Sequence, residues 1–364
     1  MFSEDLFQFV LEQFADEIGG QVAPQPPPLQ TDSYIARSAM QKAIRRGMTD
    51  LALRAAATLI AMDQRVLWRR LIVTAMEDQG VGEVDLLSRI VAASRDRTWR
   101  HKVGGDWRVI SALIRKACAC TRCQSANDLW NIAGNDPDLA VFKSGLCDAD
   151  LGDLLAFICD ERQPVTHRGV AVLVAMGEEA GPAAPTHIRP DPGAVFAAFA
   201  NAGSDSHVAV TYEYAFRQAR FSLAPLSLCL WSESRGIELS GEDDDLPPVT
   251  WLGDIPRFAL DQYTRPGLAA IRRYAYSSRP WRDFAERWRI ARADWPKAAG
   301  ELLFRVEGAV VTNRRVWGTG KRLYEKSGGL GCFMPEAAVT DGMVLIVREL
   351  TLIDKLRELS LPTT

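Results

Sequence analysis

The chain has 364 residues, of which 47% are hydrophobic and 24% charged, so it can bury the core of one large domain or two ordinary ones. A formal net charge of -3 argues against a protein that binds polyanions over its whole surface, although charge can still be concentrated locally. The acidic start is not a signal peptide, and no apolar run reaches the roughly 18 residues of a membrane span. We therefore expect a cytoplasmic protein with no membrane partner, whose seven cysteines stay reduced.

Residues 1–18 predict an acidic amphipathic helix. Its apolar residues recur at helical spacing and suit docking onto a protein partner through Phe2, Leu6, Phe9, Val10 and Phe14. The same stripe also suits a helix that folds back onto its own core. Residues 19–30, "GGQVAPQPPPLQ", predict a linker, because glycines and a proline run cannot continue a helix.

Two helical blocks are predicted, at 31–180 and 195–364. Both contain capping residues followed by apolar residues at steps of three and four. Strand-like alternation is scarce, and residues 168–177, "RGVAVLVAMG", fit either a strand or a buried helix. A Pro- and Gly-rich stretch at 178–195 predicts a loop or boundary. We expect a mainly all-α fold, a multi-helix array with long loops and at most a minor strand element.

The cysteine group "CACTRC" is the first candidate for a metal site. Thiolates of Cys118, Cys120 and Cys123 could bind zinc with His101 as a fourth ligand. Within a helix, however, Cys118 and Cys120 would point roughly 200° apart, which favours small buried side chains over ligands. We expect no metal and no cofactor.

Candidate catalytic groups are few. The chain has no local histidine motif and no G-x-S-x-G elbow. Asp261 with Tyr263, or the acidic run 243–245, is a weak candidate, and the acidic run fits a solvated loop better. Residues 317–329, "WGTGKRLYEKSGG", contain a lysine after two glycines, but they lack the first glycine of a phosphate loop and no strand is predicted before them. An enzyme is therefore the less favoured interpretation.

Residues 257–326 form the strongest functional signal. They contain 16 Lys or Arg and 7 Asp or Glu, with tyrosines and tryptophans interleaved. This composition is typical of phosphate contacts combined with base stacking on DNA or RNA. The candidates are Arg272, Arg273, Arg282, Arg289, Arg314, Arg315, Lys321 and Arg322. A docking surface for an acidic protein, or a solvated face with the aromatic side chains in the core, would give the same pattern.

The stretch "RRLIVTAMEDQG" (69–80) places two adjacent carboxylates near a helix end. Neighbouring residues on a helix diverge by about 100°, so Glu77 and Asp78 are poorly placed to act as a catalytic pair. Negative charge in the last turn is unfavourable unless cations offset it. We predict an interhelical ion network made by Arg45, Arg69, Arg70, Glu77 and Asp78.

Residues 34–82 carry a family resemblance. The positions concerned are Ser38, Gln41, Lys42, Arg45, Asp50, Ala52, Leu53, Arg69, Arg70, Leu71, Ala75, Glu77, Asp78 and Gly80. They resemble the helical region after the ATPase module in clamp-loader-like AAA+ proteins of the replication-associated recombination protein A, or maintenance-of-genome-stability, type. In that family this region helps form a tetrameric collar, and the proteins act at stalled replication forks. The chain has no Walker pair, so the resemblance implies a collar-like body without the motor.

Three functional hypotheses follow. The first is a non-enzymatic, oligomeric protein, with a tetramer as first expectation, that contacts DNA or RNA in replication, repair or mobile-element maintenance. The second is an adaptor or regulator, for example of a clamp-loader-like ATPase, that docks through the N-terminal helix. The third is an enzyme whose site has no recognisable motif.

Overall fold

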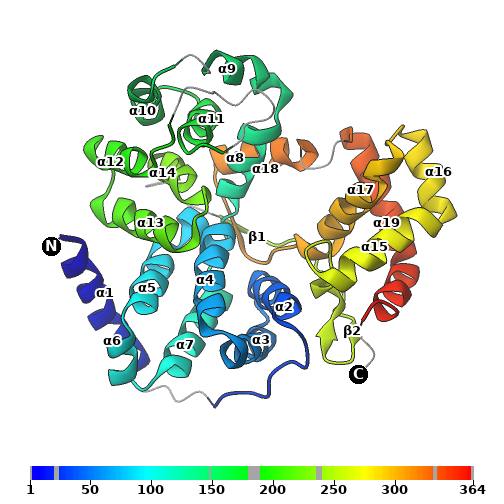
Figure 1. Cartoon of the computed structure of the whole chain (residues 1–364), viewed down its shortest axis with the longest axis horizontal. Coiled ribbons are helices and arrows are strands. Elements are labelled where there is room, and N and C mark those ends of the chain that lie inside the picture. Colours follow the sequence, from blue (N-terminus) through cyan, green and yellow to red (C-terminus); the bar gives the residue numbers. More distant parts are fainter. Residues whose placement is uncertain are drawn as a thin grey trace. The chain divides into compact units, whose positions relative to one another are not determined.

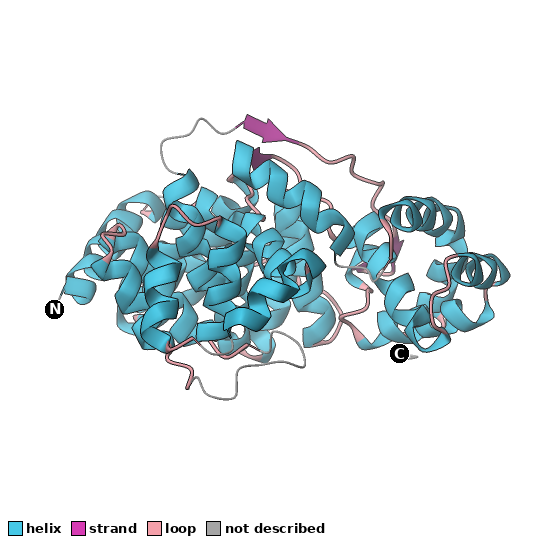
Figure 2. Ribbon diagram, turned by 90° about the horizontal axis from the view of Figure 1, so that it is seen from above, coloured by secondary structure: helices cyan, strands magenta, loops and turns pink. Residues whose placement is uncertain are grey.

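A computed structural model describes residues 2–19, 24–146, 149–178, 189–234, 240–330 and 334–361. These residues form 19 α-helices and two small antiparallel sheets of two strands each (Figure 2). The predicted all-α fold with a minor strand element is confirmed. None of the described helices is both long and apolar enough to cross a membrane. Residues 179–188 of the predicted loop or boundary at 178–195 lie outside the described part, as do two of the seven cysteines, Cys147 and Cys332.

The chain divides into two compact units. Unit 1 comprises Met1–Val22, Trp68–Glu242 and Asn313–Leu330, and unit 2 comprises Ala23–Leu67, Asp243–Thr312 and Gly331–Thr364. The first boundary falls inside the predicted linker 19–30. The predicted blocks 31–180 and 195–364 each contribute to both units, because distant segments pack together in a way that local composition does not reveal.

The described residues of unit 1 are helical apart from one small sheet, in which β1 pairs with β4. Its helices are α1 (Phe2–Ile18), α4 (Gln64–Thr74, of which Trp68 onward belongs to the unit), α5 (Val84–Arg95), α6 (Arg97–Lys102), α7 (Asp106–Ala119), α8 (Ser125–Asn135), α9 (Ala140–Gly145), α10 (Leu151–Cys159), α11 (Val165–Ala175), α12 (Pro192–Asn201), α13 (Ser206–Ala219), α14 (Leu223–Ser234) and α18 (Gly318–Leu330). Short π or 3-10 turns are η1 (Ala75–Gln79), η2 (Gly80–Gly82) and η3 (Pro137–Leu139), and the strands are β1 (Ser240–Glu242) and β4 (Arg314–Val316).

The interior of unit 1 contains α11, which packs against α8, α10 and α14. The segment 168–177 fitted either a strand or a helix. Its residues 168–175 belong to α11, and almost all of the segment is buried. A helix satisfies its own backbone hydrogen bonds, so an apolar segment can lie in the interior without a partner strand.

The N-terminal helix α1 packs onto its own unit, against α5 and α7. Val10 and Phe14 are buried, and the ring of Phe14 stacks on Trp99 with centroids 5.9 Å apart. Val10 and Phe14 thus pack onto the core of their own unit, as the fold-back alternative predicts. The prediction that these two side chains dock onto a partner is wrong. Leu6 is partly buried and Phe9 is 55% exposed, whereas the side chain of Phe2 is not among those described.

Unit 2 also consists mainly of helices. They are α2 (Ser33–Arg45), α3 (Thr49–Met62), α15 (Arg265–Ser277), α16 (Arg279–Arg287), α17 (Trp295–Leu303) and α19 (Glu336–Glu358). The shorter elements are β2 (Trp251–Leu252), β3 (Ile255–Pro256), η5 (Arg257–Ala259), η6 (Arg292–Asp294) and η7 (Phe304–Gly308). Helices α15, α17 and α19 lie side by side around one core, and α16 packs on α19 (Figure 1).

Candidate nucleic-acid interface

The surface of unit 2 is strongly basic over residues 257–312, all of which are described. Nine Lys or Arg side chains there are exposed, namely Arg265, Arg272, Arg273, Arg279, Arg282, Arg287, Arg289, Arg292 and Lys297. Exposed carboxylates in the same stretch are Asp283, Glu286 and Asp294. The excess of positive charge predicted for this segment is thus displayed to solvent, where it can interact with polyanions.

Helix α15 carries part of this charge on one face. Arg265, Arg272 and Tyr276 are exposed and follow one another at steps of seven and four residues, which places them along a single stripe. The opposite face of the helix buries Ile271 and Tyr274 in the core. The hydrophobic core therefore sets the rotation of α15 and turns the arginine and tyrosine stripe outward.

A groove of about 560 Å³ lies along this stripe. It is lined by Gln262, Tyr263, Leu268, Arg272, Tyr276, Ala293, Pro296, Lys297 and Glu301. Tyr263 is 64% exposed and Tyr276 is 46% exposed. Each of these rings also rests on a second ring, since Tyr263 makes an edge contact with Phe304 at 5.7 Å and Tyr276 lies 6.3 Å from Trp295. The groove thus combines two supported aromatic surfaces with two cations.

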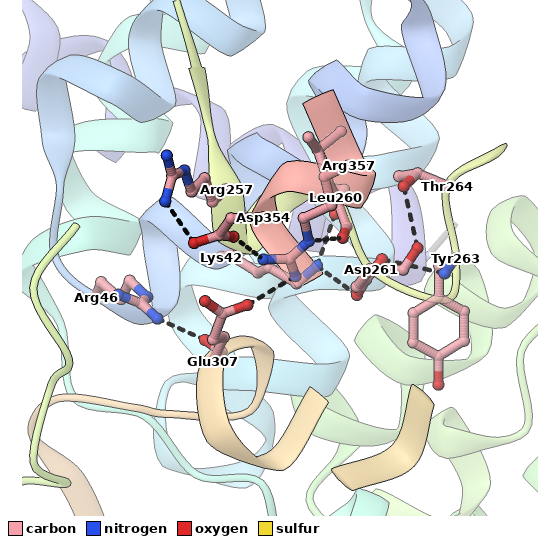
Figure 3. Close-up of polar contacts among 11 residues, drawn as sticks. Lys42, Arg46, Arg257, Leu260, Asp261, Tyr263, Thr264, Glu307, Asp354 and Arg357 are labelled. Carbon is pink, nitrogen blue, oxygen red and sulfur yellow. Dashed lines mark hydrogen bonds and ion pairs between the residues drawn. The ribbon is translucent and has the colours of Figure 1, made fainter. Parts of the chain in front are cut away.

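A buried ion pair holds the loop that presents Tyr263. Lys42 of α2 lies 2.5 Å from Asp261, and both side chains are buried (Figure 3). The other carboxylate oxygen of Asp261 accepts a hydrogen bond from the backbone N–H of Tyr263 at 3.0 Å, and the Asp261 carbonyl accepts from Thr264. Burial lowers the pKa of Lys42, and the negative charge of Asp261 acts in the opposite direction.

A second buried cation supports the same loop from α19. Arg357 is 0% exposed and donates to the Leu260 carbonyl at 2.9 Å, to Asp354 at 3.0 Å and to Glu307 at 2.7 Å (Figure 3). Burial acts to lower the pKa of Arg357, but the two carboxylates outweigh it and raise that pKa. Arg257 adds an ion pair to Asp354. The backbone at 260–261 is therefore fixed by charged contacts from two distant parts of the chain.

Gly267, in the first turn of α15, allows the helix to approach this loop closely. A Cβ atom at this position would lie 2.1 Å from the carbonyl oxygen of Asp261 and 2.5 Å from its nitrogen. Backbone atoms cannot move away as a flexible side chain can, so only glycine fits. The loop with Tyr263 and the helix with Tyr276 are thereby held close together.

The catalytic and metal candidates do not form a site in the described residues. Asp261 faces Lys42 in the interior, whereas Tyr263 points to solvent, so the two do not converge on a substrate. Within the described ranges no group of three or more His, Cys, Asp or Glu side chains could hold a metal ion. Burial raises the pKa of the Cys120 thiol to about 12 and also raises that of Cys123, which favours neutral thiols over thiolate ligands.

Four of the predicted nucleic-acid residues belong to unit 1. Arg314 is buried and lies 4.2 Å from the centre of the Tyr324 ring, and Arg315 contacts Thr121 and Glu83. Lys321 lies 3.9 Å from Glu242, and Arg322 donates to Thr319. The strand β4 ends at Val316, directly before residues 317–329, so the expectation that no strand precedes them is wrong. Lys321 and Arg322 are nevertheless exposed on unit 1. We consider the groove of unit 2 as the interface, because two exposed tyrosines and two cations line it.

The aromatic side chains of the basic segment differ in exposure, and Trp288 and Phe304 are partly buried. Tyr274, Trp281 and Trp295 are buried in the core of unit 2, so they are not available for base stacking. Tyr263 and Tyr276 are exposed in the groove. Among the predicted arginines of unit 2, Arg272 lines the groove, and Arg273, Arg282 and Arg289 are exposed elsewhere on its surface.

Several groove residues were missed by the sequence prediction. Gln262, Lys297 and Glu301 line the groove but belong to no recognisable motif. Arg265 belongs to the stripe on α15. Its spacing from Arg272 and Tyr276 fits one helix face, so helical periodicity could have predicted this stripe from the sequence.

The ion network of Arg45, Arg69, Arg70, Glu77 and Asp78 stays a prediction, and several of its members make hydrogen bonds to neighbouring segments. Arg45 belongs to unit 2 and donates to the Gly308 carbonyl, whereas Arg69 in unit 1 donates to the Ala219 carbonyl. Asp78 is buried in the π-turn η1 and accepts from the side-chain amide of Gln124 at 2.9 Å. The carbonyl of Glu77 accepts from Asn127 at 2.7 Å. Arg70, the fifth predicted member, is partly buried. The turn at 77–78 is thus fixed by amide groups of the neighbouring segment.

Comparison with known proteins adds no assignment to this groove. No family model, no curated protein and no solved structure matches the chain. The features of the groove that bear on function are therefore the exposure and the charge of its own residues.

Proposed function

We propose that unit 2 binds single-stranded nucleic acid in the groove beside α15. The observation that carries this proposal is the presence, in one groove, of two exposed tyrosines together with Arg272 and Lys297. Cationic side chains neutralise phosphates, and exposed aromatic rings stack on bases. The remaining exposed cations of residues 257–312 extend the positive surface beyond the groove.

Single strands suit this groove better than duplexes. Bases in a duplex are already stacked on one another, so a tyrosine in a groove cannot reach their faces without opening the helix. Unpaired bases expose both faces, and each stacking contact with an aromatic side chain is worth about 1–3 kcal/mol. Tyr263 and Tyr276 each contact another ring, which restricts their side chains and lowers the entropy cost of stacking on a base.

The wider role that we propose is non-enzymatic and lies in DNA replication, repair or mobile-element maintenance. Its support is the resemblance of residues 34–82 to the collar region of clamp-loader-like proteins, which also suggests an oligomer, with a tetramer as the first expectation. Residues 34–67 of this stretch belong to unit 2, the same unit as the groove. Mass measurement by light scattering tests the oligomeric state independently of nucleic-acid binding.

Binding is tested by fluorescence anisotropy with a labelled single strand of about 16 nucleotides, the upper end of typical site sizes. Reversing the charge of the groove in the double variant Arg272→Glu, Lys297→Glu should weaken binding by at least about tenfold at low salt, a change of about 1.4 kcal/mol. The matched control is Arg65→Glu, because this arginine also belongs to unit 2, is 97% exposed and does not line the groove.

The outcomes separate cleanly. A loss confined to the groove variant, with an unchanged circular dichroism spectrum, supports the proposal. Failure of the wild-type chain to bind DNA or RNA strands at low salt, or an equal loss in the control, would contradict it.

A further inference from the structure

The groove contains a carboxylate as well as cations. Glu301 of α17 lines it together with Gln262 and Lys297. The side-chain amide of Gln262 donates to Oε1 of Glu301 at 3.1 Å, which helps to orient the carboxylate in the groove. Partial burial raises the pKa of Glu301, while the hydrogen bond from Gln262 and the charges of Arg305 and Lys297 act to lower it. An oriented acceptor beside two stacking rings is unexpected in a site that binds only phosphates, because it repels them.

We infer that Glu301 selects guanine among the bases that stack on Tyr263 or Tyr276, by accepting hydrogen bonds from N1–H and the N2 amino group. This inference rests on the proposed binding of single strands. A carboxylate has two oxygens in one plane and accepts a pair of parallel donors well. Guanine presents two adjacent donors on its Watson–Crick edge, and this edge is accessible when the base is unpaired.

The other bases match the carboxylate less well. Adenine and cytosine each present one amino donor next to a ring nitrogen that is an acceptor, and thymine or uracil presents one N–H between two carbonyl groups. Each of them would bring an acceptor lone pair against a Glu301 oxygen, which is repulsive. Such a mismatch discriminates by both a lost hydrogen bond and an unpaired polar group. A bidentate contact of this kind typically gives roughly 10- to 100-fold discrimination.

The test uses competition by thymine oligonucleotides that differ at one central base. A single guanine avoids self-association of guanine tracts, and hypoxanthine replaces guanine without the N2 amino group. For the wild-type chain we expect guanine to compete at least about tenfold better than adenine, cytosine or thymine, with hypoxanthine in between. In Glu301→Gln the guanine preference should disappear, while affinity for the all-thymine strand stays the same or rises.

The matched control is Asp294→Asn, which removes an exposed carboxylate that does not line the groove and should leave the preference intact. Thermal unfolding followed by circular dichroism checks that both variants fold. Equal competition by all bases, or guanine and hypoxanthine competing equally, would overturn guanine selection. In that case a loss of binding in Arg272→Glu, Lys297→Glu would still uphold the proposed function, whereas absence of binding to any strand would refute both.

Discussion

Unit 2 contains two sets of arginines whose surroundings differ completely. Arg357 is buried and donates to Glu307, Asp354 and a backbone carbonyl, whereas Arg272 is exposed beside an aromatic groove. Removing a cation from water costs several kcal/mol, so a buried arginine has to be paired. An exposed arginine has no such requirement and can exchange its counterions for phosphates. The number of arginines in a segment therefore does not show where a binding surface lies. The burial and the pairing of each arginine have to be known.

The aromatic residues of the same segment divide in the same way. Trp281 is buried in the core beside Tyr274, while Tyr276, two residues after Tyr274, faces the groove. On a helix, residues two apart point in nearly opposite directions, so one tyrosine stabilises the fold and the other is available for a ligand. Buried members should thus control stability and exposed members should control binding.

Removing a buried arginine should have the largest effect on the stability of the fold. Arg357→Met leaves Glu307 buried without its main cation, and we expect the free energy of unfolding to fall by about 3–5 kcal/mol. Urea unfolding followed by tryptophan fluorescence measures this change. The control Arg279→Met alters an arginine that is exposed and 4.0 Å from Asp283, and it should change stability by less than about 0.5 kcal/mol. Similar losses in both variants would show that burial does not distinguish the two sets.

Helix α1 offers the same contrast with apolar residues. Phe14 is buried against Trp99, so Phe14→Ala should destabilise the protein by about 3–5 kcal/mol. Phe9, on the same helix, is more than half exposed, and Phe9→Ala should have little effect, within about 0.5 kcal/mol. The melting temperatures of the two variants provide the measurement. A normal melting temperature for Phe14→Ala would mean that α1 does not pack on its own unit in solution, and would revive docking onto a partner.

The sequence predicted the helical fold because helix periodicity and capping are local. It also predicted the basic, aromatic character of residues 257–326, which is a matter of composition. It did not predict that Arg314 and Arg315 would join unit 1 while Arg272 joined unit 2, because that division depends on contacts between distant segments.

The ion pair that holds the Tyr263 loop could not be predicted from local sequence patterns for the same reason. Lys42 and Asp261 are 219 residues apart in the chain, and no spacing rule connects them. Lys42 even appeared as part of a family-like helical motif, with no sign that its partner would be a loop residue in unit 2. The groove residues Gln262 and Glu301 likewise become neighbours only after α15 and α17 pack together.

The dependence of binding on salt concentration tests the central claim most directly. If Arg272 and Lys297 contact phosphates of a single strand, the logarithm of the association constant should fall linearly with the logarithm of the salt concentration. Each phosphate contact that is removed should lower the magnitude of this slope by about 0.7. The double variant Arg272→Met, Lys297→Met should therefore show a slope smaller by about 1.4 than the wild-type chain, and Arg65→Met should keep the wild-type slope. An unchanged slope in a correctly folded double variant would contradict the placement of the nucleic acid in this groove.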